Sequence, residues 1–299
     1  MSLNVPWSAL HHKALVYAPT ASPERADEVP DALSVPVPAS PQPSRQRLRF
    51  GRVWVDVLSF AEALRAIEAL VDARQGGSVF TPNVDHVVKA ESNEAFRRAY
   101  DDVSLSLADG MPLIWSAPLL GCPLPERVAG SDLLMPVLEM AARRKWRVYL
   151  LGGAPGVAPT VAEMLTRDMG ITVVGWDDAF IERDGSDPSG NSVARAQAAQ
   201  ADLIFVALGP PKQELWIHRS REAIRPAVAL GVGASLDFLA GKYKRAPEWM
   251  RRYGLEWAYR LSQEPRRLWR RYLVEGPRFL GIVLSTWRRP LPERLRQHP

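Results

Sequence analysis

The chain has 299 residues, of which 46% are hydrophobic and 24% are charged, which suits one α/β domain of moderate size with flanking segments. The single cysteine, Cys122, excludes an intramolecular disulfide framework and a cysteine-based zinc site, and it favours a reducing compartment. No apolar run reaches the length of about 18 residues that a membrane-spanning helix needs, and the N-terminus lacks a signal-peptide pattern. We therefore expect a cytoplasmic protein, either soluble or bound to a membrane surface.

The net charge of +5 is distributed unevenly along the chain. Residues 242–299 contain 15 Lys and Arg against five Glu, a net charge of +10, so residues 1–241 carry a net charge of −5. A basic tail on an acidic body indicates an anionic partner, such as nucleic acid, anionic lipid or a phosphorylated substrate.

Near the N-terminus, residues 18–46 are rich in Pro, Ala and Ser and show no sustained apolar period. Such a segment buries too little apolar surface to offset the entropy of ordering it. We predict that residues 1–47 form a flexible extension. A Pro-rich ligand for another protein is the weaker alternative.

Residues 48–241 alternate short β-branched runs with segments of helical period. RVWVDV is followed by SFAEALRAIEALVDAR, and the alternation continues with the runs SVFTP, VSLSLAD, RVYLLG, ITVVGW, DLIFVALG and AVALGVG. This spacing predicts an α/β catalytic domain with a Rossmann-like, mostly parallel sheet and helices on both faces. Ligands of such sheets bind beyond the carboxyl ends of the strands, so functional residues are expected there.

Residues 242–299 have a different composition. Arg clusters alternate with Trp, Tyr and Leu at helical spacing, Pro265 and Pro277 interrupt the pattern, and four of the ten tryptophans lie here. The apolar length is too short to span a bilayer, which favours amphipathic helices lying in the headgroup region. We predict a basic, membrane-docking appendage.

Two neighbouring strands end in polar residues. Thr81 and Asn83 follow the run VF, and Asp109 with Gly110 follows SLSLA. For Thr81 and Asn83, helix capping is the more economical interpretation on this motif alone, and Asp-Gly is also common in turns. Because both strand ends should lie at one edge of the sheet, a second interpretation is a site in which Asp109 accepts a proton from a substrate hydroxyl.

Three further segments suit an anionic ligand. Arg127 precedes a predicted helix with Asp132 in its first turn, a pattern that fits an anion site or a surface salt bridge. LLGGAPG is a glycine-rich turn whose amides can bind a diphosphate, and it lacks the G-x-G-x-x-G spacing of a dinucleotide site. GPPKQE begins another helix, either as a ligand contact or as an exposed helix start. The candidate residues are Arg127, Gly152, Gly153, Gly156, Lys212, Gln213 and Glu214.

No cofactor or metal is indicated by the sequence. The five histidines are not spaced as a site, Asp-x-Asp does not occur, and neither a Walker loop nor a G-x-S-x-G elbow is present. We therefore predict that no divalent metal is required and that Arg, Lys and backbone amides meet the charge of a leaving group. Asp237, in a further glycine-rich strand end, is as compatible with a structural role as with a functional one.

Seven motifs in order resemble the WecG/TagA/CpsF glycosyltransferases, glycosyltransferase family 26. They are TPN, ADGMPLIW, RVAGSDLL, LLGGAPGVA, GPPKQELWI, GVGASLDFLAGKYKRAPEWMRRYGLEWAYRL and EPRRLWRRYL. The resemblance covers roughly residues 49–275. The resemblance implies an inverting transferase that moves a hexose from a UDP-sugar to a polyprenyl-diphosphate-linked saccharide in bacterial cell-surface or exopolysaccharide synthesis. It implies UDP-N-acetylmannosamine, its uronic acid or UDP-glucose as donor, without choosing among them.

The resemblance also implies roles for residues. Asp109 corresponds to the proposed general base, Thr81 and Asn83 to the TPN motif, and Arg127 and Gln213 to further family motifs. The basic tail corresponds to an appendage implicated in membrane docking and in closing the active site. Its arginines would meet lipid diphosphate or anionic headgroups: Arg260, Arg266, Arg267, Arg270 and Arg271. Asp85 and His86 stand where relatives more often have Glu nearby, so the donor sugar cannot be inferred from the motif.

The expected partners are a UDP-sugar donor, a polyprenyl-diphosphate-linked acceptor and the anionic inner face of the cell membrane, with no nucleic acid. Homo-oligomerisation stays open. Two other functions compete with this one. The first is a nucleotide-binding Rossmann-like enzyme of another class, against which the missing G-x-G-x-x-G argues. The second is a non-catalytic membrane-surface adaptor that uses only the basic tail.

Overall fold

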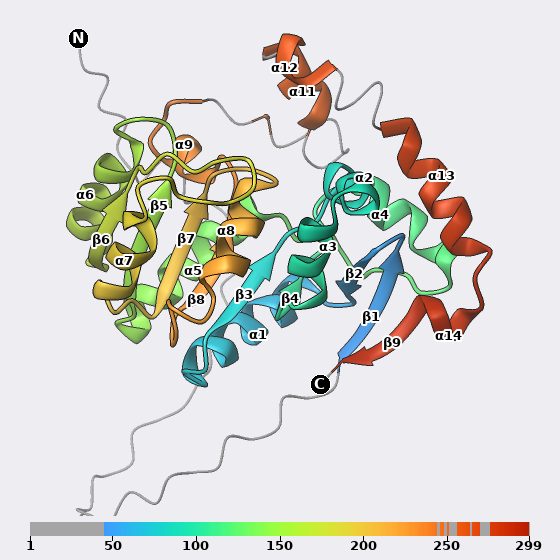
Figure 1. Ribbon diagram of the computed structural model, residues 1–299, viewed down its shortest axis with the longest axis horizontal. Helices are drawn as coiled ribbons and strands as arrows, with labels where there is room; N and C mark the ends of the chain where they lie inside the picture. Colours follow the sequence, from blue (N-terminus) through green and yellow to red (C-terminus); the bar gives the residue numbers. More distant parts are fainter. Residues whose placement is uncertain are drawn as a thin grey trace, which may run out of the picture. The chain divides into compact units, whose positions relative to one another are not determined.

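The structure is a computed structural model that describes residues 45–243, 246–247, 250, 256–263, 265–269 and 276–298 (Figure 1). Of the predicted extension, residues 1–44 lie outside the described residues, and a strand already begins at Arg45. Arg270 and Arg271 also lie outside them, as do the side chains of Arg260 and Arg267.

A six-stranded sheet forms the centre of the protein, with the order β4-β3-β8-β7-β5-β6 and parallel pairing at every step. This confirms the predicted parallel α/β sheet. Its strands are β3 (Gly77–Phe80), β4 (Leu105–Ser106), β5 (Arg147–Gly152), β6 (Thr172–Asp177), β7 (Leu203–Ala207) and β8 (Val228–Gly231).

Helices cover both faces of this sheet, as the alternation predicts. Side chains of β5 alternate between two cores, with Val148 and Leu150 in one and Tyr149 and Leu151 in the other, because successive residues of a strand point to opposite faces. The first core takes side chains from α1 (Phe60–Asp72), α5 (Gly130–Arg144), α6 (Val157–Met169) and α9 (Ser235–Leu239). The second takes them from α2 (Val84–Ser92), α3 (Glu94–Asp101), α7 (Asn191–Ala198) and α8 (Lys212–Ser220).

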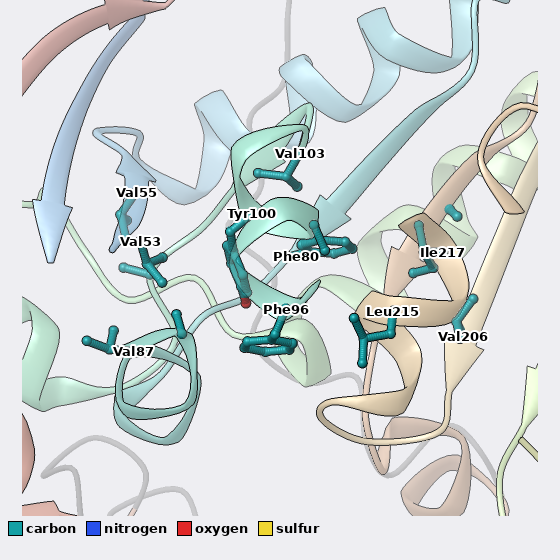
Figure 2. Close-up of a cluster of buried hydrophobic side chains, with 14 of the residues drawn as sticks. Val53, Val55, Phe80, Val87, Phe96, Tyr100, Val103, Val206, Leu215 and Ile217 are labelled. Carbon is teal, nitrogen blue, oxygen red and sulfur yellow. The ribbon is translucent and has the colours of Figure 1, made fainter. Parts of the chain in front are cut away.

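Local sequence explains why these segments are helical. In α1, Ser59 and Glu62 form a capping box, and Ala63, Ile67 and Val71 recur at helical spacing on the buried face. In the second core, Phe96 and Tyr100 of α3 lie one turn apart and pack edge-to-face with ring centroids 5.2 Å apart (Figure 2). The helices are therefore fixed by burial of one apolar stripe each.

One strand prediction was wrong in its sheet assignment. RVWVDV contains β2 (Val53–Asp56), but β2 pairs antiparallel with β1 (Arg45–Phe50) rather than joining the parallel sheet. Only Gly51 and Arg52 separate the two strands, and a two-residue connection permits only a hairpin. The buried Asp56 carboxylate accepts hydrogen bonds from Arg47 and from the backbone N–H of Ser106, which ties this hairpin to β4.

The C-terminal residues complete the hairpin sheet. Strand β9 (Leu295–His298) pairs antiparallel with β1, giving the order β2-β1-β9. Helix α13 (Gly276–Trp287) packs against α2, β1 and the short 3-10 helix η2 (Pro118–Leu120), and it buries Phe279 and Val283. The remaining helices are α4 (Met111–Ser116), α11 (Glu256–Gln263), α12 (Pro265–Trp269) and α14 (Leu291–Arg294).

Residues 276–298, the end of the predicted appendage, thus share a sheet and a core with residues 45–56. The division of function between residues 48–241 and 242–299 stays a prediction. No helix within the described ranges combines the length and the apolar character needed to cross a bilayer.

Candidate active site

The loops that follow β3 and β4 are in direct contact at the carboxyl edge of the sheet. The backbone N–H of Asp109 donates to the carbonyl of Pro82 over 2.8 Å. Gly110, with φ of +121°, lies so close that a Cβ added there would be 3.8 Å from Cβ of Asn83. The structure therefore brings the predicted residues Asn83 and Asp109 together.

Asp109 shares an arginine with a second carboxylate. Nη1 of Arg127 lies 3.7 Å from Oδ1 of Asp109, and Nη2 donates to Oδ2 of Asp132 over 2.6 Å. The three side chains are 18% to 28% exposed, so they border solvent without extending into it. Such a carboxylate can both meet a substrate and keep a defined orientation.

Thr81 lies beneath the start of α5. It is buried, and a Cβ on Gly130, the first residue of α5, would stand 3.1 Å from its Oγ1 and 3.2 Å from the carbonyl oxygen of Gly231. Glycine at this position lets the N-terminus of a 15-residue helix approach the ends of β3 and β8. The dipole of such a helix end favours an anion at this edge.

The glycine-rich loop after β5 is shaped by close backbone contacts. Gly152 and Gly153 both have φ of +89°, and a Cβ on Gly152 would lie 2.8 Å from the carbonyl oxygen of Ala207. Gly156 precedes α6, and a Cβ added there would have no atom of the described residues within 4 Å. Asp237 accepts the N–H of Ala154 over 2.9 Å, so its carboxylate has a structural role in holding this loop.

Lys212 does not reach this loop in the structure. Its Nζ donates to the carbonyl oxygen of Ile181 over 2.6 Å and lies 5.0 Å from the ring centroid of Phe180. Both partners belong to the connection between β6 and α7. A role for Lys212 at a substrate phosphate would require this contact to open.

Gln213 and Glu214 point inward rather than toward an exposed ligand. Gln213 is 3% exposed and Glu214 is fully buried. Gln213 accepts the N–H of Gly233 over 3.0 Å and donates through Nε2 to Oε1 of Glu214 over 2.7 Å. The two residues therefore join the start of α8 to the loop that follows β8.

His86 is a residue that sequence reasoning left without a role. Its Nδ1 lies 2.9 Å from Oδ1 of Asn83, and its Nε2 lies 3.3 Å from Oε1 of Glu214. The available signal was its position three residues after the N-cap Asn83, where a capping box places a side chain that turns back to the cap. The sequence around Tyr100 carries no such signal. Burial of Tyr100, followed by the charge of Glu214, raises the pKa of its phenol well above the usual value.

Among the residues that the structure describes, no three His, Cys, Asp or Glu side chains are grouped in a way that suits a metal ion. Of the predicted tail arginines, Arg266 lies on α12 and is exposed. The candidate active site therefore lies at the edge of the sheet, where β3, β4, β5, β7 and β8 end.

The family model described as "Glycosyl transferase WecG/TagA/CpsF family" matches residues 48–292. The chain belongs to this family. That confirms the predicted resemblance, and it confirms the prediction that the chain is a glycosyltransferase.

Two curated relatives are similar to this glycosyltransferase over most of its length. Both are named N-acetylglucosaminyldiphosphoundecaprenol N-acetyl-beta-D-mannosaminyltransferase. The protein from Bacillus spizizenii (strain ATCC 23059 / NRRL B-14472 / W23) is 35% identical over 218 residues, which cover 72% of this chain and 81% of the relative. The protein from Bacillus subtilis (strain 168) is 32% identical over 218 residues, covering 72% and 82%.

Proposed function

We propose that this glycosyltransferase moves N-acetylmannosamine from UDP-N-acetylmannosamine to a polyprenyl-diphosphate-linked N-acetylglucosamine. The observation that carries the proposal is the contact between the Asn83 and Asp109 loops, in a chain that is similar to two relatives named for this transfer. The uronic acid of N-acetylmannosamine and glucose are the competing donor sugars from the sequence interpretation.

In the proposed reaction, Asp109 is the general base. The acceptor hydroxyl attacks the anomeric carbon from the face opposite UDP, so a new C–O bond forms while the bond from that carbon to UDP breaks. The hydroxyl proton passes to the Asp109 carboxylate, and UDP leaves with the electron pair. This order inverts the configuration at the anomeric carbon. The partial exposure of Asp109, at 28%, supports access by an acceptor.

The charge on the leaving UDP needs positive groups at the same edge. Arg127, the N-terminus of α5 and the amides of Gly152 and Gly156 are the groups that we assign to the substrate phosphates. The amide of Gly153 donates to the Ala207 carbonyl over 2.9 Å, so it could bind a phosphate only if that hydrogen bond opened. Lys212 joins them only if its contact with Ile181 opens. Gln213 and Glu214 are both buried, so we assign them a structural role beneath this edge of the sheet and no contact with the phosphates.

The donor is tested by measuring UDP release with a panel of UDP-sugars and a lipid-linked N-acetylglucosamine acceptor. UDP-N-acetylmannosamine should react faster than UDP-glucose or the uronic acid. Preference for one of those two would overturn the donor assignment and leave the reaction class intact. NAD binding without UDP binding in calorimetry would favour an enzyme of another class.

We also propose that the enzyme docks on an anionic membrane surface at the inner face of the cell membrane. On α13, Leu280, Leu284 and Trp287 recur at helical spacing and are 70%, 44% and 46% exposed. This exposed apolar strip adjoins the buried strip of Phe279 and Val283, so part of the apolar surface of α13 is uncovered.

Positive charge flanks the exposed strip of α13. Arg278 and Arg288 are exposed on this segment, and Arg266 is exposed on α12. Leu and Trp beside Arg suit the headgroup region of a bilayer, and each basic residue near an anionic surface contributes about 1 kcal/mol of attraction. Arg260, Arg267, Arg270 and Arg271 remain predicted contacts of the same kind.

A further inference from the structure

A chain of buried polar contacts runs behind the candidate active site. It begins at Asn83 after β3, passes through His86 on α2 and Glu214 on α8, and ends where Gln213 accepts the N–H of Gly233 after β8. His86 and Gln213 are each 3% exposed, and Glu214 is not exposed at all. The ends of β3, β7 and β8 are thus joined through a partly buried Asn83 and three buried side chains.

The proton of the His86 ring can be placed from these contacts. Oε1 of Glu214 receives the N–H of Gln213 and faces Nε2 of His86, so the ring must supply the hydrogen at Nε2. The backbone N–H of Asn83 points at Nδ1 over 3.2 Å. Glu214 therefore fixes which ring nitrogen carries the proton. The other nitrogen, Nδ1, is left to accept the backbone N–H of Asn83.

Helix capping alone does not account for this arrangement. A cap needs only a group at the His86 position that accepts the N–H of Asn83. It does not need a fully buried carboxylate on another helix, 128 positions along the chain, which costs several kcal/mol of desolvation. Oε2 of Glu214 and the hydroxyl of Tyr100 are moreover buried and have no hydrogen-bond partner among the described residues, so the cluster is costly to keep.

We propose that His86 and Glu214 are positioning residues for sugar transfer. Glu214 orients the His86 ring, and Nδ1 of the ring accepts the backbone N–H of Asn83, which holds Asn83 at the edge beside Asp109. Oδ1 of Asn83 separately accepts the N–H of Asp85 over 3.1 Å, which fixes the amide oxygen and with it the direction of the amide nitrogen. This proposal rests on the proposed role of Asn83 in transfer.

The test is a double-mutant cycle on transfer kinetics with the full chain. His86→Leu and Asn83→Ala should each lower kcat, on the order of 10²-fold for a misplaced group. Because His86 acts through Asn83, the double variant should be no slower than Asn83→Ala alone. The KM for the UDP-sugar should change by less than about threefold in His86→Leu, since the groups assigned to the diphosphate are unaltered.

Glu214→Gln and Glu214→Ala extend the cycle. Gln keeps an oxygen that accepts from the His86 ring, so kcat should fall less in Glu214→Gln than in Glu214→Ala. Nitrogen NMR of labelled histidine gives a readout that does not depend on activity: Nε2 of His86 should be protonated in the wild type and lose that preference in Glu214→Ala.

Ser192→Ala is the matched control. Ser192 is buried and accepts the indole N–H of Trp216 on α8 over 3.0 Å, so its loss also breaks a buried hydrogen bond. We expect this variant to lower the free energy of unfolding and to leave kcat unchanged. Additive effects of His86→Leu and Asn83→Ala would overturn the positioning role, as would a His86 ring protonated only at Nδ1. Absence of transfer by the wild type with every UDP-sugar would instead overturn the proposed function.

Discussion

Asp109 owes its place in the candidate site to backbone contacts as much as to its charge. Its N–H is held by the Pro82 carbonyl, and Gly110 after it adopts a positive φ that a side chain would strain. Arg127 then stands between Asp109 and Asp132. A carboxylate with a fixed backbone and one neighbouring guanidinium is suited to accept a proton repeatedly in one geometry.

Asp109→Asn should lower the rate of sugar transfer on the order of 10²- to 10⁴-fold, because an amide cannot accept the acceptor proton. Calorimetry should show UDP binding within error of the wild type, since the glycine-rich loop is unchanged. Asp184→Asn, at an exposed aspartate paired with Arg219, is the control and should keep full activity. Full transfer by Asp109→Asn would remove the residue from the mechanism.

Gly130→Ala tests the close approach of α5 to the strand ends. The new methyl group would lie 3.1 Å from Thr81 and 3.2 Å from the Gly231 carbonyl oxygen, so we expect a loss of about 1–3 kcal/mol in the free energy of unfolding. Gly276→Ala, where an added Cβ has no atom of the described residues within 4 Å, should cost far less. Urea denaturation of both variants measures the difference, and equal stabilities would contradict the contact.

At the scale of elements, the C-terminal segment both packs against the rest of the protein and exposes apolar side chains. Helix α13 turns Phe279 and Val283 to the protein and leaves Leu280, Leu284 and Trp287 exposed. Strand β9 adds a third strand to the hairpin and brings His298 beside Arg45. The sequence pattern of Arg, Trp and Leu predicted amphipathic helices but not the strand, because β9 forms only through its pairing with β1.

Replacing Leu284 and Trp287 with Gln should reduce flotation of the enzyme with vesicles that contain anionic phosphatidylglycerol. Vesicles of neutral phosphatidylcholine should bind the wild type more weakly, because the flanking arginines add attraction only at an anionic surface. Trp176→Gln, at a tryptophan on β6 that is 44% exposed, is the matched control and should float as the wild type does. Unchanged flotation of the α13 variant would exclude this strip as the docking surface.

His298 makes the stability of the small sheet depend on pH. Burial, followed by the charges of Arg47 and Arg45, lowers the pKa of His298 from 6.5 to about 4. Between these values the unfolded chain binds the proton and the folded chain does not, so the free energy of unfolding should fall as pH falls from about 6.5 to 4. His298→Gln should flatten that slope in denaturation curves; an unchanged slope would assign it to other groups.

At the scale of the whole molecule, segments from both ends of the described chain pack together beside the parallel sheet. The hairpin at residues 45–56 receives β9 from the C-terminal segment, and the ring of Phe50 stacks on Phe279 at 6.5 Å. Asp56 links that small sheet to β4, the strand that leads to Asp109. The C-terminal residues therefore support the candidate site from a distance.

Deletion of residues 276–299 should lower the melting temperature and the free energy of unfolding. Phe279 and Val283 alone contribute about 2 kcal/mol each through burial, and β1 would lose a neighbouring strand. Deletion of residues 1–40, within the predicted flexible extension, is the control and should leave the melting temperature unchanged. Equal melting temperatures of the two truncations would show that the C-terminal segment does not stabilise the body.

The parallel sheet, its two helical layers and the meeting of Thr81, Asn83 and Asp109 at one edge follow from the sequence alone. Periodicity of apolar residues reports which face of an element is buried, and parallel strands place their carboxyl ends together. These are consequences of local pattern and of one topological rule.

Other features were decided only by the tertiary structure. The sequence interpretation directed Lys212, Gln213 and Glu214 toward a ligand, whereas Lys212 contacts Ile181 and the other two are buried. A buried Glu214 depends on a histidine 128 positions away, and β9 depends on a strand at the other end of the described chain. No local pattern encodes such partners, because the energy that keeps them in place arises only when distant segments exclude water together.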